Sequence, residues 1–271
     1  MADNRAIGVF DSGLGGLTVA KRIMELMPDE NIVYFGDTGR VPYGTKSVDT
    51  IRTYAIEDER FLISKGVKMI VAACGTVSSV AADTGDFWNV PFVEVISHSV
   101  KDAVALSENG KIGVLGTPAT VKSHRHRDLI RESLPEALVV ETAAPLLVSL
   151  AEEGWYTPDN EIARLTVETY LADMKKEGVD TVILGCTHFP VFADIIKECL
   201  PGVKLVDMGV SAAKQVKETL KACGGENEGG APVSHKFFVS DKPVAFKKTV
   251  RIFLGDCAEN IDIDLVDAKE L

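Results

Sequence analysis

Two cysteines stand at the ends of similar apolar runs in different halves of the chain. The segment "VAACGTVSSV" contains Cys74, the segment "VILGCTHFPV" contains Cys186, and a threonine follows closely in each, Thr76 and Thr187. A thiol acts as a base or nucleophile through its thiolate. A strand end that runs into a helix N-terminus lowers a thiol pKa, because free backbone N–H groups and the helix dipole favour an anion. The sequence therefore predicts two reactive thiols in matching contexts.

Two thiols that face each other across a cleft suit one reaction in particular. One thiolate removes a proton from a carbon, and the other thiol delivers a proton to the opposite face, which inverts the stereocentre. A lone buried cysteine usually acts as a small apolar residue. We assign that role to the remaining cysteines, Cys199, Cys223 and Cys257. The repeated pattern is what favours chemistry at the other two.

Short apolar segments alternate with segments of helical periodicity. Strands are expected at Ala6–Phe10, Asn31–Phe35, Val67–Ala73, Phe92–Ile96, Lys111–Leu115, Leu138–Glu141, Val179–Leu184, Val203–Val206, Lys236–Ser240 and Ile263–Val266. Helices are expected at Leu17–Met27, Val48–Lys65, Val100–Ser107, Ala119–Ser133, Asp159–Lys176, Val191–Leu200, Val210–Cys223 and Val244–Leu254. This alternation predicts an α/β fold with parallel sheets covered by helices on both faces.

An internal echo suggests two similar units. "AIGVFDSG" near the start returns as "KIGVLGTP" from Lys111, and a Cys-containing strand end follows in each unit. We predict two doubly wound parallel-sheet domains, residues 1–97 plus 208–271 and residues 98–207, with the active site in the cleft between them. Ligands of such sheets bind at the carboxyl ends of the strands. The predicted strand ends carry "DSGLGG", "GDTGRVPYG", "CGT", "SHS", "GTPAT" and "GCTH", which suit a small polar ligand.

The composition restricts the classes of partner and the cell compartment that are expected for this chain. The 271 residues carry a formal net charge of −11, and an acidic surface repels phosphate backbones and anionic lipid. The sequence shows no apolar run near the roughly 20 residues that span a bilayer and no secretion signal. We therefore expect a cytoplasmic protein with free thiols and with neither nucleic acid nor membrane as partner. The absence of a C-x-x-C pair argues against structural zinc.

The chain resembles the glutamate racemases. The resemblance covers nearly the whole chain and rests on "IGVFDSGLGGLTV", "VPYG", "AACGT", "IGVLGT", "SLAEEGW", "LGCTHFP" and "LVDMG" in that order. It implies a cofactor-independent and metal-free isomerase that interconverts L- and D-glutamate and supplies D-glutamate for peptidoglycan. It also implies a homodimer. The Cys-Thr-His of the second motif resembles glutamate racemases more than aspartate racemases, which have Cys-Thr-Glu.

The resemblance also implies roles for individual residues. Cys74 and Cys186 match the two catalytic cysteines, and Asp11 and Ser12 match a pair that contacts the substrate amino group and assists the first cysteine. Substrate contacts are implied for Tyr43, Gly44, Gly75, Thr76, Thr117, Thr120 and Thr187. The physics agrees, since threonine hydroxyls and loop N–H groups can bind carboxylates.

The second cysteine has an implied helper. His188 matches a histidine that assists Cys186, and a neutral imidazole could hold or pass the proton. Glu152 most resembles the acidic residue beside that histidine, although Glu153 remains open. His98 follows a predicted strand end and has either a site role or a structural one. We place His124 and His126 on a solvated helix face.

Departures from the family pattern leave alternatives open. Gly75 stands where the family usually has asparagine, Met208 where serine is common, and Ala144 where cysteine is common. "SHS" also replaces a usual Glu-Pro-Gly. Loss of one substrate hydrogen bond costs about 0.5–1.5 kcal/mol. A racemase for another acidic amino acid such as aspartate, or a non-catalytic binding protein on the same fold, for example one that binds DNA gyrase, is therefore the competing hypothesis.

Overall fold

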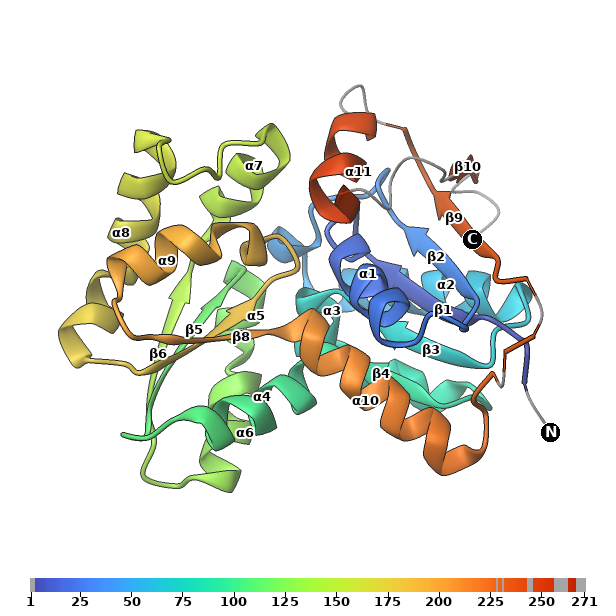
Figure 1. Cartoon of the computed structure of the whole chain (residues 1–271), viewed down its shortest axis with the longest axis horizontal. Coiled ribbons are helices and arrows are strands. Elements are labelled where there is room, and N and C mark those ends of the chain that lie inside the picture. Colours follow the sequence, from blue (N-terminus) through green and yellow to red (C-terminus); the bar gives the residue numbers. More distant parts are fainter. Residues whose placement is uncertain (1–2, 228, 231, 243–245, 256–262, 267–271) are drawn as a thin grey trace.

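The computed structural model describes residues 3–227, 229–230, 232–242, 246–255 and 263–266. Within these residues the chain forms two lobes, each built on its own parallel sheet (Figure 1). The first sheet has the strand order β10-β9-β2-β1-β3-β4 and the second has the order β6-β5-β7-β8. The predicted fold class, two parallel-sheet α/β domains, is confirmed.

The strands of the first sheet come from both ends of the chain. They are β1 (Ile7–Asp11), β2 (Ile32–Gly36), β3 (Met69–Ala72), β4 (Phe92–Glu94), β9 (His235–Val239) and β10 (Ile263–Leu265). Every pairing is parallel, with β1 between β2 and β3 and with β9 beside β2. The C-terminal strands β9 and β10 thus belong to the first sheet.

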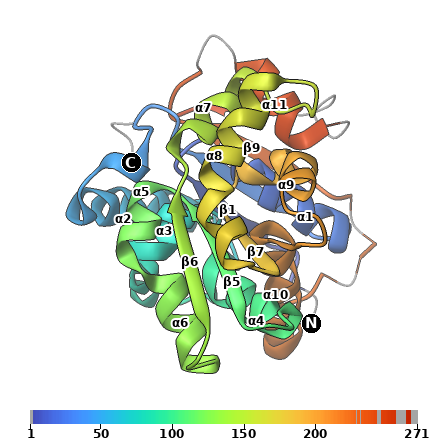
Figure 2. The ribbon, with the colours of Figure 1, turned by 90° about the vertical axis from the view of Figure 1, so that its left-hand side faces the viewer.

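The second sheet comes from the middle of the chain. It contains β5 (Lys111–Gly116), β6 (Leu138–Ala143), β7 (Thr181–Gly185) and β8 (Lys204–Asp207), all parallel. Figure 2 shows this lobe from its outer side, with β6 in front and helices on either side of the sheet. The predicted boundary at residues 97 and 98 falls inside one helix and stays a prediction.

Helices cover both faces of both sheets. The α-helices are α1 (Leu17–Leu26), α2 (Val48–Ser64), α3 (Gly75–Val80), α4 (Val95–Leu106), α5 (Pro118–Ser123), α6 (Arg125–Ser133), α7 (Pro145–Glu153), α8 (Glu161–Glu177), α9 (Ala193–Cys199), α10 (Met208–Cys223) and α11 (Phe246–Leu254). The 3₁₀ segments are η1 (Tyr43–Thr45), η2 (Ala82–Phe87) and η3 (Phe189–Phe192). No helix in the described part of the chain is both long enough and apolar enough to cross a membrane.

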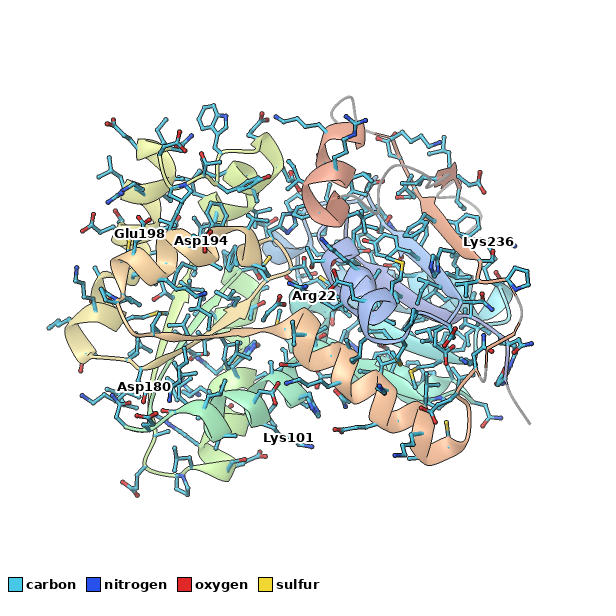
Figure 3. All side chains as sticks on the ribbon, in the orientation of Figure 1. Arg22, Lys101, Asp180, Asp194, Glu198 and Lys236 are labelled. Atoms are coloured by element: carbon cyan, nitrogen blue, oxygen red, sulfur yellow. The ribbon has the colours of Figure 1, made fainter. Side chains whose placement is uncertain are left out.

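One apolar cluster joins the two lobes. It contains Ile7 and Val9 from the first sheet, Ile112 and Ile183 from the second, and Val216 from α10, all fully buried. α10 packs on both α1 and α4, so it couples the helical layers of the two domains. The other faces of the sheets have separate clusters. The charged side chains of Asp194 and Glu198, labelled in Figure 3, are exposed.

The strand expected at Phe92–Ile96 is shorter than predicted. It ends at Glu94, whose carboxylate accepts hydrogen bonds at 2.6 and 2.9 Å from two backbone N–H groups of the next turn. This N-cap starts α4 at Val95, whereas the sequence periodicity placed the helix from Val100. His98 therefore lies inside a helix rather than at a strand end.

The single helix expected over Ala119–Ser133 is two helices. His124, with a φ of 54°, is in the left-handed region and separates α5 from α6. Its Nδ1 lies 2.6 Å from Glu141 Oε2. The solvated position predicted for His126 is wrong, because that residue is fully buried in the core layer under α6. Burial, followed by the charge of the neighbouring arginine, lowers the pKa of His126 to about 3.

Two helices at the site, α3 and α7, are missing from the predicted helix ranges, although a helix N-terminus was expected after Cys74. α3 has six residues, too few for a helical period to be visible. α7 carries a residue type typical of helix ends at each of its two ends. Pro145 occupies its first turn and Gly154, with a φ of 80°, ends it in the left-handed conformation.

Candidate active site

A cavity of about 340 Å³ lies between the carboxyl ends of the two sheets. It contains every predicted site residue except Thr120. Its lining is Asp11, Ser12, Gly13, Val41, Pro42, Tyr43, Gly44, Thr45, Cys74, Gly75, Thr76, Thr117, Pro118, Pro145, Val148, Ser149, Glu152, Cys186, Thr187 and His188. Strand ends of both domains therefore meet at one pocket of a size suited to a small polar molecule.

Cys74 lies at the N-cap of α3, directly after β3, and is buried. Its Sγ lies 3.5 Å from the Oγ of Ser12. Asp11 at the end of β1 is held by the backbone N–H groups of Gly13 and Gly16, which donate to its Oδ2 at 3.1 and 2.9 Å. This arrangement fixes a carboxylate beside the first thiol.

The predicted lowering of the Cys74 pKa is wrong. Burial, and next the negative charge of Asp11, raises the pKa of the thiol to about 12. The helix N-terminus is present as predicted, but α3 is one and a half turns long, and desolvation of the thiolate outweighs it. Cys74 is therefore a protonated thiol, ready to donate a proton.

Cys186 has different surroundings. β7 ends at Gly185, and a 3₁₀ turn rather than an α-helix begins at Phe189, so the predicted helix N-terminus at this cysteine is wrong. The partner is instead a side chain, since Cys186 Sγ lies 3.7 Å from Nδ1 of His188. Nε2 of the same imidazole lies 3.1 Å from Oε1 of Glu152.

The geometry decides between the two candidate glutamates. Glu152 faces His188, whereas Glu153 is exposed and its Oε2 lies 3.8 Å from the Nζ of Lys248. Burial by itself lowers the pKa of His188, but the hydrogen bonds with Cys186 and Glu152 outweigh burial and raise it to about 10. The prediction of a neutral imidazole is therefore wrong, and His188 is a cation whose Nδ1 lies beside the sulfur of Cys186.

Two contacts between the domains involve the predicted threonines. Thr76 Oγ1 of the first domain lies 3.0 Å from Thr117 Oγ1 of the second. Thr18 Oγ1 donates to the carbonyl of Thr187 at 3.2 Å. Thr120 is fully buried behind Thr117, with its Oγ1 3.0 Å from that of Thr117. Its position suits holding Thr117 better than touching a ligand, and its substrate contact stays a prediction.

Glycines allow the domains to approach this closely. A Cβ on Gly15 would lie 2.3 Å from Thr187 Oγ1 and 2.6 Å from the ring of His188. A Cβ on Gly75 would lie 2.6 Å from the carbonyl oxygen of Gly185. The "GLGG" turn and the glycine after Cys74 therefore have a steric role, since no side chain fits there without movement.

Sequence reasoning missed one wall of the cavity. Pro145, Val148 and Ser149 line it together with Glu152, from one face of α7. Their spacing of three, four and seven residues is that of a helix face. Recognition of α7 from its Pro and Gly end signals would have found them.

The four cysteines within the described residues, Cys74, Cys186, Cys199 and Cys223, are free thiols. Cys257 lies outside the described residues. In the same part of the chain, no group of three or more His, Cys, Asp or Glu side chains is arranged to hold a metal ion.

Comparison with known proteins places this site in a family. Residues 15–216 match the Asp/Glu/Hydantoin racemases. The chain belongs to this family. It is 44% identical over 258 residues to the glutamate racemase of Geobacter metallireducens, with 93% of each chain covered. It is 43% identical over 264 residues to that of Neisseria meningitidis serogroup C, with 96% of each covered. The crystal structure of Francisella tularensis glutamate racemase in complex with D-glutamate superposes with a TM-score of 0.90 at 35% identity, covering 98% of each chain.

Proposed function

We propose that this protein is a glutamate racemase that interconverts L- and D-glutamate without a cofactor, through two cysteine thiols. The observation that carries the proposal is that Cys74 and Cys186, from different domains, line one cavity and have separate polar partners. The family membership and the full-length similarity to glutamate racemases support glutamate as the substrate.

The two thiols have different surroundings. The His188 imidazolium lies beside the sulfur of Cys186, and burial keeps Cys74 protonated. The Cys186 thiolate takes the α-proton, and the C–H electron pair remains on the α-carbon, delocalised into the carboxylate. The S–H bond of Cys74 then breaks as its proton adds to the opposite face. The product enantiomer forms, Cys74 becomes the thiolate and Cys186 the thiol, and the opposite enantiomer uses the same steps in reverse.

Substrate charges are matched by the lining. Asp11 supplies an acceptor for the ammonium group, and its carboxylate is already fixed by two backbone N–H groups. Hydroxyls of Thr76, Thr117 and Thr187 supply donors for the two carboxylates. Held in this way, the α-carbon lies between the sulfurs, and orientation of this kind lowers the barrier of proton transfer.

A cellular role accompanies the activity. We propose that the D-glutamate supplies peptidoglycan synthesis in the cytoplasm and that the enzyme works as a homodimer. The similarity to glutamate racemases supports the D-glutamate product, and the resemblance to that family implies the role and the dimer.

The decisive experiment follows proton and stereochemistry together. Purified protein is incubated with L-glutamate and, separately, with D-glutamate in D₂O, with circular dichroism for optical activity and NMR for deuterium at the α-carbon. We expect racemisation and deuterium incorporation from both enantiomers, and a loss of about 10²–10⁴-fold in Cys74→Ser and in Cys186→Ser. Cys199→Ser, outside the cavity, is the matched control. Turnover of aspartate but not glutamate would establish the other substrate, and stable optical activity with no exchange would reject a racemase.

A further inference from the structure

A buried polar cluster stands behind the cavity wall formed by Tyr43. The phenol is buried, and behind it lie Asp37, after β2, and Asp58, on α2, both completely buried. Tyr43 Oη is hydrogen bonded to Asp37 Oδ2 and lies 3.1 Å from Asp58 Oδ2. Neither aspartate lines the cavity, so the proposed proton transfers do not use them.

The oxygens of Asp37 have donors on every side. Ser240 Oγ donates to Oδ1 at 2.7 Å, and Arg40 Nε donates to Oδ2 at 2.5 Å, in addition to the phenol. This is the set of partners expected of an ionised carboxylate.

The oxygens of Asp58 have fewer hydrogen-bond donors than those of Asp37. Oδ1 accepts from an Arg40 terminal nitrogen at 3.0 Å, but Oδ2 faces the oxygen of Tyr43. A phenol has one O–H, and two ionised carboxylates have no proton to offer. If the phenol donates to Asp37, an ionised Asp58 Oδ2 faces an oxygen lone pair. A proton on Asp58 Oδ2 resolves the conflict, because Asp58 then donates to Tyr43 and Tyr43 donates to Asp37.

The net charge of the cluster also favours a proton on Asp58. Arg40 is the cation paired with both aspartates and with Glu57, which is partly exposed and solvated. The guanidinium also stacks 4.1 Å from the ring centroid of Tyr54. Two ionised aspartates would leave a net negative charge in a desolvated site, which is costly. Burial, and next the charge of Asp37, raises the pKa of Asp58 well above its usual range.

We propose that Asp58 carries a proton at neutral pH and, by donating it to Tyr43, is a positioning residue that fixes the Tyr43–Gly44 wall of the substrate cavity. The wall presses directly on the second domain, since a Cβ on Gly44 would lie 3.0 Å from Thr117 Cβ. A shift of the phenol therefore moves the side of the cavity where we place the substrate carboxylates. This inference rests on the proposed racemase function for its kinetic consequence, but not for the protonation itself.

Asp58→Asn is the first test, because an amide can donate to Tyr43 and accept from Arg40 as the protonated acid does. We expect this variant to unfold in urea at pH 7.5 at the wild-type concentration or higher, with kcat/KM for glutamate within about threefold of wild type. Asp58→Ala, which removes the donor, should raise KM by roughly tenfold with a smaller effect on kcat. Rescue by asparagine and not by alanine separates positioning from simple packing.

The pH dependence of stability is an independent test of the protonation of Asp58. A carboxyl group whose pKa is higher in the folded state than in the unfolded state stabilises the fold while it is protonated. Its contribution to the free energy of unfolding is lost as pH rises from the unfolded pKa to the folded pKa. Across this range the unfolding equilibrium constant of wild type should increase by about tenfold per pH unit relative to Asp58→Asn. Asp37→Asn is the matched control, and it should destabilise the protein because it removes an ionised partner of Arg40.

Two outcomes would overturn the proposal. Destabilisation by Asp58→Asn as large as that by Asp37→Asn, with no change in pH slope, would mean that Asp58 is ionised. Equal KM values in the alanine and asparagine variants would mean that the wall is not positioned by this residue. Because the urea measurements need no turnover, an inactive wild type would reject the racemase and leave the protonation result intact.

Discussion

A methyl group at residue 75 should wedge the two domains apart beside the thiols. In Gly75→Ala the new Cβ would lie 2.6 Å from the carbonyl oxygen of Gly185, whereas ordinary van der Waals contact begins at 3.4 Å. The obstacle is backbone, directly before Cys186, so a rotamer change cannot relieve it. The strand ends must separate locally by about 0.8 Å, the difference between those two distances.

The expected cost follows from this displacement. Overpacking of this kind costs about 1–3 kcal/mol of stability. A misplacement of about 1 Å at a reacting centre can cost roughly 100-fold in rate. We therefore expect kcat for glutamate racemisation, followed by circular dichroism, to fall by about 10- to 100-fold in both directions, because both sulfurs must reach the same carbon.

A control variant and a double variant test whether the carbonyl of Gly185 is the obstacle. Gly225→Ala, with its nearest obstacle a cysteine side chain at 3.2 Å and no role in the cavity, should keep full activity. Met208→Ala removes the methyl group that would lie 3.2 Å from the new Cβ, but not the carbonyl, so the double variant Gly75→Ala/Met208→Ala should remain impaired. Wild-type kcat in Gly75→Ala, or full recovery in the double variant, would show that the carbonyl does not limit domain closure. The asparagine common at this position in the family would meet the same obstacle here.

Three further measurements test the electrostatics. Glu152 helps to raise the pKa of His188 to about 10, so Glu152→Gln should lower that pKa and move the alkaline limb of kcat to lower pH; an unchanged NMR titration of the imidazole would contradict this. At pH 8 a thiol of pKa about 12 is about 0.01% ionised, so iodoacetamide should label Cys74, followed by peptide mass spectrometry, at least about tenfold more slowly than it labels free cysteine; labelling at the rate of free cysteine would refute the protonated state of Cys74. Glu59 is fully buried, and burial is the main cause that raises its pKa from 4.5 to about 7. Because the folded state favours the protonated form, the free energy of unfolding should fall as pH rises between those two values. In urea titrations of Glu59→Gln this fall with pH should be absent.

The sequence determined the elements and the chemical inventory. Alternation of apolar runs with helical periods predicted the parallel sheets, because a strand buried on both faces is apolar throughout. The strand ends predicted the site, because the carboxyl ends of parallel strands share one edge. Cys74 and Cys186 were therefore predicted before any contact was known, whereas the pairing of His188 with Glu152 was implied only by the family resemblance, and the choice of Glu152 over Glu153 needed the structure.

Local features that the apolar pattern does not report explain where the helices differ from the prediction. α3 is too short to show a period, and α4 begins early because Glu94 caps it, an effect that apolar spacing does not report. His126 resembles a surface residue in "SHRHRD", but the break at His124 reorients the next helix and buries it. At α4 a local hydrogen bond overrode the pattern, and at His126 one left-handed residue did.

Protonation states were beyond the reach of sequence. The segments around Cys74 and Cys186 look alike, yet one thiol lies beside a carboxylate in a desolvated pocket and the other beside an imidazolium. Residues far apart in the chain create these differences, since Asp11 approaches Cys74, and Glu152 approaches His188, only after folding. Sequence fixes which groups can ionise. Tertiary structure decides which of them do, because desolvation and neighbouring charge depend on distances that no spacing along the chain determines.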